Sequence, residues 1–312
     1  MYMIMTKHSI INSGKTLTLA LTALVAMAAC SQDEGAPQQD PSRAITFNVT
    51  TLGAQTVTTR AELTEQLSSE FGLMAYRHSH DEWTGNDELP NFMYRVKATK
   101  PEGAATWSTA TQYYWPFTAE HMRFFAYAPF SIIDDKMSAN TQTGAPQIKE
   151  YAVAADPIDQ QDLMFAWSDD MLCSNGGAVA LPFRHIMTAI RFAVPDSETG
   201  TINNIQLVDI PCTGTYTAMG SWGTPHTPAT YTGQLGTTFI LMPQTLPASA
   251  KLVVNYKKDA TSLAKDLVFS LAGKEWQQGR IYTYTINIVN SELQPEISNW
   301  EAVSDETLAV DY

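Results

Sequence analysis

Hydrophobic and polar residues alternate along many short segments of this chain, and the alternation predicts a protein built of β-strands. Ile45, Phe47 and Val49 alternate with polar residues, the period-two pattern of a half-buried strand, over 45–52. Further β-type runs follow, separated by Gly, Pro, Asn and Asp. They predict strands at 71–76, 92–96, 112–117, 122–127, 162–167, 179–183, 186–194, 202–210, 215–219, 238–242, 251–256, 267–271 and 280–289.

The spacing of these runs indicates an all-β fold of the sandwich or barrel class. No segment has a long apolar stripe of helical period, so we expect little helix beyond turns at 61–69 and 119–122. A polar run after 194 interrupts the strands, which predicts an N-terminal domain over 44–195 and a C-terminal domain over 196–290. The segments 268–271 and 282–288 are expected to close the second domain as an antiparallel pair.

A tail over 291–312 is expected to lie outside the closed second domain. Leu308, Val310 and Tyr312 alternate with less apolar residues, which is again a strand pattern. A competing strand pattern covers 296–303. A chain with a detachable strand near each end is suited to assembly with other subunits.

The first 29 residues have the order of features found in a secretion signal. Lys7 and Lys15 precede an apolar run over 17–29, and small residues come directly before Cys30. The run is shorter than the roughly 20 apolar residues of a transmembrane helix.

The end of this signal resembles the bacterial lipobox, which implies that Cys30 is acylated and anchors the mature protein in a membrane. An ordinary cleaved signal with an incidental cysteine is the alternative. Residues 30–43 contain almost nothing that can be buried, so they are expected to form a flexible tether.

The composition limits which partners the protein is expected to bind and which disulfides it can form. Removing Lys7 and Lys15 from 19 basic residues leaves 17 against 32 acidic residues, a net charge of −15, and clustered cations for phosphate binding are lacking. Nucleic acid is therefore excluded as an expected partner. Besides Cys30, only Cys173 and Cys212 remain. They are expected as two separate buried thiols, with a disulfide between them as the alternative.

Several aromatic motifs in a fixed order resemble one protein family. Tyr-Tyr-Trp-Pro at 113–116 is followed by aromatic runs at 122–129, 162–165 and 181–192. Together they resemble the fimbrillin family of Bacteroidales type V pili. The resemblance implies two transthyretin-like β-sandwich domains with Greek-key-like antiparallel sheets, no cofactor and no enzymatic activity. It also implies a lipid-anchored subunit of the fimbrium at the outer membrane and cell surface, whose pilin partners are joined by strand addition.

The same resemblance implies a processing mechanism. An arginine-specific protease would cut between Arg60 and Ala61, the first strand would leave with the lipid, and a neighbour's strand would fill the groove. Cleavage after Arg43 would instead leave the groove filled. The outgoing plug residues would be Ile45, Phe47 and Val49, and the incoming donor residues would be Leu308, Val310 and Tyr312.

The sequence offers little support for catalysis or metal binding. Adjacent acids at 81–82, 134–135 and 169–170 are expected to be solvated charges, because glycoside hydrolysis needs carboxylates facing each other across a cleft. His78 and His80 form a His-x-His pair without a third ligand, and His185 is expected to be a core or edge histidine. Asp156, Asp159 and Asp162 do not have the spacing of an EF-hand loop.

A lipid-anchored glycan-binding protein is the alternative function. Exposed tryptophans stack on sugar rings, although tryptophans in strands pack by default in a core. The candidates for such a surface are Trp83, Trp107, Trp115, Trp222 and Trp276.

Overall fold

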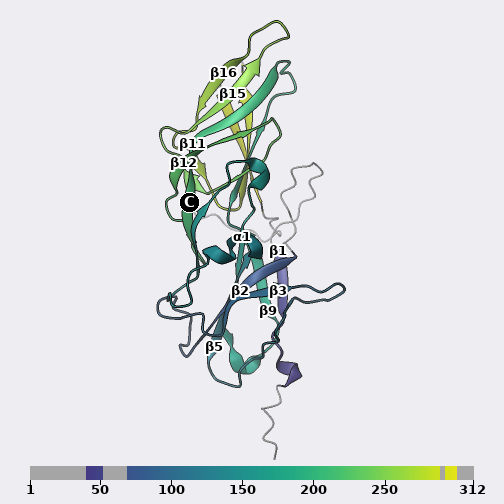
Figure 1. The fold of residues 1–312 in the computed structure, drawn as a ribbon, viewed down its shortest axis with the longest axis vertical. Helices are drawn as coiled ribbons and strands as arrows, with labels where there is room; N and C mark the ends of the chain where they lie inside the picture. Colours follow the sequence, from purple (N-terminus) through teal and green to yellow (C-terminus); the bar gives the residue numbers. More distant parts are fainter. Residues whose placement is uncertain (1–39, 52–68, 289–291, 301–312) are drawn as a thin grey trace, which may run out of the picture. The chain divides into compact units, whose positions relative to one another are not determined.

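The computed structural model describes residues 40–51, 69–288 and 292–300, and this part of the chain is built of strands (Figure 1). Helical structure in the described residues is limited to the one-turn α1 (Phe130–Ile133) and four short 3-10 turns. The prediction of an all-β fold with little helix is confirmed. The helical turn expected at 119–122 is wrong, because β5 already begins at His121. The turn expected at 61–69 lies almost entirely outside the described residues.

The largest sheet has eight strands in the order β1-β9-β7-β5-β2-β3-β4, with β8 beside β5. Most neighbours are antiparallel, whereas β1 and β9 run parallel. The bounds are β1 (Phe47–Thr51), β2 (Glu70–His78), β3 (Met93–Thr99), β4 (Ser108–Thr109), β5 (His121–Ala128), β7 (Met164–Trp167), β8 (Met171–Leu172) and β9 (Val179–His185).

The central strands of this sheet are buried on both faces. In β2, Phe71 and Leu73 pack into one hydrophobic cluster, while Met74 and Tyr76 pack into another. Because successive side chains of a strand point to opposite faces, this division separates the two faces of the sheet. We call the cluster that contains Phe71 the first core and the cluster that contains Met74 the second core. The uninterrupted apolar run at 71–76 follows from burial on both faces.

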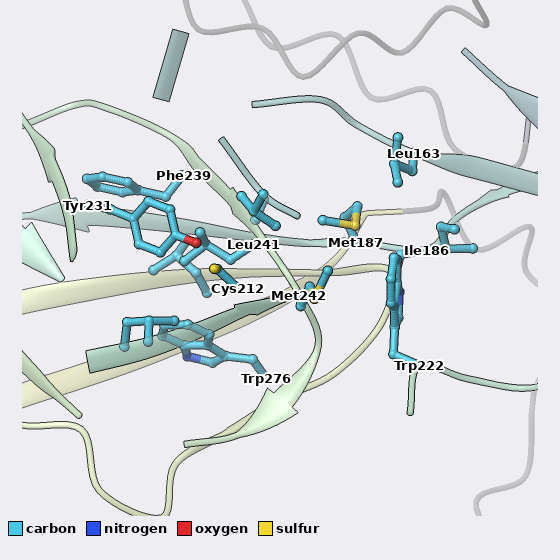
Figure 2. Packing of buried hydrophobic residues seen from close by; sticks show 14 of the residues in the cluster. Leu163, Ile186, Met187, Cys212, Trp222, Tyr231, Phe239, Leu241, Met242 and Trp276 are labelled. Atoms are coloured by element: carbon cyan, nitrogen blue, oxygen red, sulfur yellow. The ribbon is translucent and has the colours of Figure 1, made fainter. Parts of the chain in front are cut away.

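The remaining strands form three smaller sheets around the second core, part of which Figure 2 shows. A four-stranded sheet has the order β13-β10-β18-β19, a five-stranded sheet has the order β12-β11-β15-β16 with β6 beside β11, and β14 pairs with β17. The bounds are β6 (Gln147–Ala152), β10 (Thr188–Ala193), β11 (Thr201–Thr217), β12 (His226–Gly233), β13 (Phe239–Leu241), β14 (Gln244–Thr245), β15 (Lys251–Lys257), β16 (Lys265–Ser270), β17 (Glu275–Trp276), β18 (Arg280–Asn287) and β19 (Glu292–Asn299).

Two strands that precede residue 195 pair with strands that follow it. β6 pairs with β11, and β10 pairs with β13 and β18. The domain boundary between 195 and 196 stays a prediction.

Two expected strands, 202–210 and 215–219, are one continuous strand, β11. On one edge, β11 pairs with β15 as far as Val208 and with β6 from Thr213, so Pro211 falls between the two partners. The missing N–H of this proline therefore breaks no ladder on that edge. A bulge next to Asp209, whose φ is 60°, absorbs the irregularity.

Three other strand predictions need correction. The segment 112–117 forms only an isolated bridge between Ala44 and Tyr114, and Pro116 cannot donate to a ladder. The expected pairing of 268–271 with 282–288 is wrong, because β16 pairs with β15 and β18 lies between β10 and β19. The tail was expected outside the domain, yet its first part is β19, an edge strand paired along all of β18.

Candidate functional site

The first strand, β1, pairs with β9 along its length, and its first residue is also hydrogen-bonded on the other side. On one side it runs parallel to β9, from Phe47 opposite Val179 to Thr51 opposite Phe183 (Figure 1). On the other side, the Phe47 N–H donates to the Trp107 carbonyl at 3.2 Å, and the Trp107 N–H donates back at 3.1 Å. Just before the strand, the Ile45 N–H donates to the Tyr113 carbonyl at 2.8 Å. We call the groups that contact residues 43–51 the β1 site.

The side chains of this strand alternate between core and solvent. Ile45 and Phe47 are 1% and 0% exposed and belong to the first core, Val49 packs against it, and Asn48 and Thr50 are exposed. The alternation predicted from the sequence is confirmed. The Phe47 ring meets Phe71 and Phe124 edge-on, with ring centroids 6.4 and 5.9 Å apart. The β1 site therefore combines main-chain pairing with two deep side-chain contacts.

The Arg43 side chain binds the start of this segment to the rest of the fold. The sequence did not indicate these contacts. Its guanidinium donates to four main-chain carbonyls, those of Trp115, Pro116, Cys173 and Ser174, at 2.7 to 3.2 Å. It also lies 4.0 Å from the centre of the Phe117 ring. An arginine presents several donors in a rigid fork, so one side chain ties the segment to two separate loops. A protease could take this arginine into its specificity pocket only after these bonds break.

Several predicted site residues lie outside the described part of the chain. These residues are Cys30, Arg60, Ala61, Leu308, Val310 and Tyr312. The described part of the tail ends at Trp300, which is buried and stacks on His185 with ring centroids 4.4 Å apart. The competing tail strand at 296–303 is thus partly used within this chain's own sheet, in β19.

The remaining cysteines are free. Cys173 belongs to the first core and Cys212 to the second, and both are buried. Burial raises the pKa of the Cys173 thiol, since a thiolate is poorly solvated there. The alternative of a disulfide between them is therefore not realised.

Asp81, Glu82, Asp135 and Asp169 are exposed, as expected, whereas other acidic residues singled out from the sequence have structural partners. His185 is buried in the core as expected, with Nδ1 2.8 Å from the Asp162 carboxylate. Burial raises the pKa of Asp162, and His185 opposes that shift. Asp156 accepts a hydrogen bond from the Ile158 N–H and caps a 3-10 turn. The expectation of solvated charges is wrong for Asp134, which binds the Arg95 guanidinium and the Tyr127 hydroxyl, and for Asp170, which pairs with His78.

The tryptophans offer no exposed platform for a sugar ring. All seven lie in the described residues, and each is buried or half-buried. Trp115 and Trp276 are almost completely buried. Where helices are described, none is long and apolar enough to cross a membrane.

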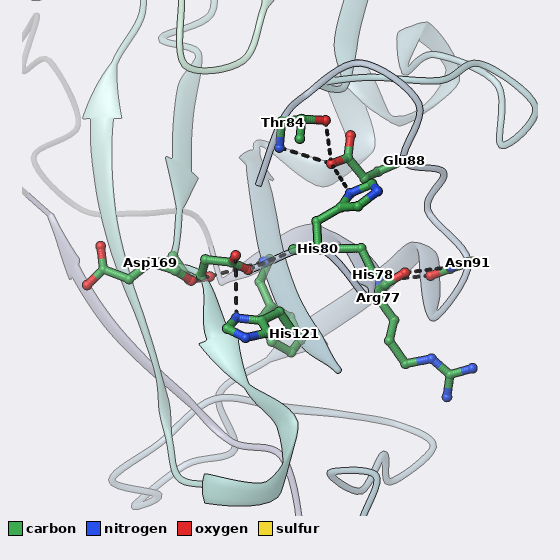
Figure 3. A network of polar contacts seen from close by, with 11 residues as sticks. Arg77, His78, His80, Thr84, Glu88, Asn91, His121 and Asp169 are labelled. Atoms are coloured by element: carbon green, nitrogen blue, oxygen red, sulfur yellow. Dashed lines mark hydrogen bonds and ion pairs between the residues drawn. The ribbon is translucent and has the colours of Figure 1, made fainter. Parts of the chain in front are cut away.

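A buried glutamate organises the loop between β2 and β3 (Figure 3). Glu88 accepts hydrogen bonds from the Thr84 N–H and hydroxyl and from the Asn86 N–H, at 2.8 to 3.0 Å. Burial by itself would raise the pKa of Glu88, but these hydrogen bonds outweigh it and lower the pKa to about 2. The loop therefore depends on an ionised carboxylate.

Replacing this residue, Glu88→Gln, is expected to reduce the free energy of unfolding by about 2 kcal/mol at neutral pH. The folded-state pKa lies below the unfolded value of 4.5, so this stabilisation is present above pH 4.5 and is lost as the pH falls towards 2. Denaturant titrations should show a smaller difference in the free energy of unfolding between the wild type and the variant at pH 3 than at pH 7. Glu82→Gln, on the exposed part of the same loop, is the control; an equal and pH-independent loss in both variants would contradict the prediction.

The fold is that of known fimbrial β-sandwich proteins. A fimbrial protein from Bacteroides vulgatus superposes with a TM-score of 0.55 at 20% identity, covering 82% of this chain and 99% of that chain. A candidate cell adhesion protein from Bacteroides uniformis gives a TM-score of 0.56 at 16% identity, covering 84% of this chain and 100% of that chain. At this level of identity, the two structural similarities concern the fold alone.

The sequence defines the family. The family model described as fimbrillin-like matches residues 59–300, and the chain belongs to this family. The fimbrium subunit Fim1C of Phocaeicola vulgatus is 31% identical over 208 residues, which cover 60% of this chain and 53% of that protein. This chain thus matches about half the length of that relative. The family resemblance inferred from the aromatic motifs is confirmed.

Proposed function

We propose that this chain is the precursor of a pilus subunit that polymerises by strand exchange. An arginine-specific protease cuts after Arg60, residues 30–60 depart with the lipid on Cys30, and the strand of a neighbouring pilin takes the β1 site. The subunit reaches the cell surface as a lipoprotein of the outer membrane and contributes there to adhesion. The role is structural and needs no catalytic group.

The environment of β1 is the observation that carries this proposal. Once the chain is cut after Arg60, only hydrogen bonds and side-chain packing would hold β1 to the rest of the protein. A replacement strand can form the same main-chain bonds on both sides, and its alternate side chains can enter the first core. Removal of β1 without replacement would expose Phe71, Phe124 and their neighbours, so an empty site is unstable and favours a new occupant.

The end of the chain has the pattern of such a replacement. Leu308, Val310 and Tyr312 have the same two-residue spacing as Ile45, Phe47 and Val49. Residues 292–300 are already engaged by β18, His185 and Gly279. Residues 301–312 are therefore the better donor candidate within the tail.

The contacts of Arg43 support Arg60 as the processing residue. The four carbonyls and the Phe117 ring hold the Arg43 side chain, and cleavage there would leave β1 in place. The glycan-binding alternative lacks support, since no tryptophan of the chain is exposed. Strand exchange is thus the function that the geometry favours.

Two matched variants, Arg60→Lys and Arg43→Lys, test the proposal against an arginine-specific protease. Wild type and Arg43→Lys are expected to be cut, to begin at Ala61 by N-terminal sequencing, and to form oligomers on size-exclusion chromatography. Arg60→Lys should resist cleavage and stay monomeric. A new N-terminus at Ala44 would overturn the assignment of Arg60. Complete cleavage at Arg60 with persistent monomers would overturn strand exchange.

A further inference from the structure

We propose that His78, His80 and Glu88 form a zinc-binding site in the loop that follows β2. His78 is the last residue of β2, and the other two residues lie in the loop that leads to β3 (Figure 3). Each residue offers one ligand atom, and the three atoms lie within 4.8 Å of one another. Two histidines and one carboxylate are a ligand set that Zn²⁺ uses with a fourth position left open. This inference is independent of strand exchange.

His78 is prepared for a metal ion by its surroundings. Its Nε2 lies 3.0 Å from the Asp170 carboxylate, while its Nδ1 is buried and has no hydrogen-bond partner. The side chain is only 3% exposed. A histidine that binds a metal typically gives its second ring nitrogen to a carboxylate, which fixes the tautomer and leaves the other lone pair free. A buried nitrogen without a partner costs free energy, and a cation bound there would remove that cost.

Glu88 brings the negative charge to the site. Its Oε1 accepts two hydrogen bonds from Thr84, and its Oε2 accepts one from the Asn86 N–H, which leaves a lone pair on Oε2. These bonds hold the carboxylate in one orientation, as the partners of metal ligands do. In the sequence, His78 and His80 have no third ligand beside them, because Glu88 follows eight residues after His80. Only the fold of the loop brings Glu88 near the two histidines.

His80 closes the site from the solvent side. Its Nδ1 lies 3.5 Å from Glu88 Oε1, and its side chain is 45% exposed. Ligand atoms around a tetrahedral zinc ion are about 3.3–3.5 Å apart, given Zn–N distances near 2.0–2.1 Å. Because Oε1 already accepts two hydrogen bonds, coordination through Oε2 requires the His80 side chain to turn, and the exposure of this side chain leaves room for that rotation.

The pocket around these residues has room for the ion and a water molecule. Its volume is about 270 Å³, and Arg77, Asp87 and Asn91 also line it. The Arg77 guanidinium is engaged elsewhere, with Nε 3.4 Å from the Glu120 carboxylate. Asp170 lies behind His78 and also faces His121, with 3.6 Å between its Oδ2 and the His121 Nδ1. Glu88 and Asp170 therefore give the site two carboxylates to balance a divalent cation.

Zinc titration of the full chain, prepared without an affinity tag, tests the site. Competition with a chromogenic chelator should show one Zn²⁺ bound to the wild type, and His80→Asn should bind it at least about tenfold more weakly. His80 is half-exposed, so the variant is expected to fold, which circular dichroism can verify. His226→Asn is the matched control, because His226 is an exposed histidine 3.2 Å from a glutamate outside the site.

A second variant separates coordination from surface adsorption. Asp170→Asn removes the carboxylate behind His78, and such a loss typically weakens metal binding about 10–100-fold. Co²⁺ in the wild-type site should give the visible absorption of a tetrahedral complex, which His80→Asn should lose. Equal zinc affinity in the wild type and His80→Asn would overturn the proposal, as would the absence of zinc binding at tens of micromolar.

Discussion

Replacing Phe47 with alanine is expected to lower the free energy of unfolding of the uncut chain by about 3–5 kcal/mol. Phe47 has no exposed surface, and its ring contacts Phe71 and Phe124 in the first core. Truncation removes this burial and leaves a cavity between the rings. Because the Phe47 main chain is hydrogen-bonded on both sides, the backbone cannot shift to fill the cavity without losing main-chain bonds. Urea or guanidinium unfolding of the uncut protein measures the loss.

Asn48→Ala is the matched control, because Asn48 is on the same strand and faces solvent. It should change stability by less than about 0.5 kcal/mol. The same pair links stability to assembly. After cleavage at Arg60, Phe47→Ala should release the first strand faster and speed oligomer formation at least about tenfold, since each 1.4 kcal/mol is about a tenfold change. An equal loss of stability in both variants would show that Phe47 does not hold β1 in place.

The second large effect is expected from Gly72→Ala in β2. A Cβ atom at Gly72 would clash with Cζ of Tyr127, the residue directly opposite on β5. The Tyr127 ring cannot easily move, because it stacks on Phe130 and its hydroxyl lies 2.5 Å from an Asp134 oxygen. Overpacking and the lost charge-assisted hydrogen bond together should cost about 3 kcal/mol or more. Thermal or denaturant unfolding measures this cost.

Gly223→Ala provides the comparison for this substitution. A Cβ atom there would meet nothing closer than a main-chain oxygen at 3.6 Å, an ordinary contact. Its stability should stay within about 1 kcal/mol of the wild type. If Gly72→Ala changed the free energy of unfolding as little as Gly223→Ala, the prediction would be contradicted. The Tyr127 ring would then have another position of similar free energy.

Local patterns predicted much of the secondary structure but missed elements whose pairing is distant. β1, β2, β5 and β9 follow from alternation or from apolar runs. β6 and β12 were not expected, since their exposed or half-exposed residues make the pattern weak, and both depend on β11 for pairing. The predicted break near Pro211 was wrong because the position of a proline relative to the neighbouring strands cannot be read locally.

For the candidate sites too, the sequence predicted the local features and missed the contacts between distant residues. The alternation of Ile45 and Phe47 was visible in the sequence, and burial confirms it. The bonds of Arg43 to four carbonyls were not visible, because main-chain carbonyls carry no residue signature and these belong to loops more than 70 residues away. Glu88 joined His78 and His80 only through the path of a loop.

The sequence by itself determined the all-β class, the buried face of the first strand and the fimbrillin-like family, since all three depend on residue order over short distances. The tertiary structure alone decided what surrounds that strand and the zinc-site candidate. Hydrogen bonds and ion pairs join groups by distance in space, and that distance is set when the sheets pack. The strand at 45–52 is therefore recognisable from its own residues, whereas its retention by β9, Trp107 and Arg43 is a property of the folded chain.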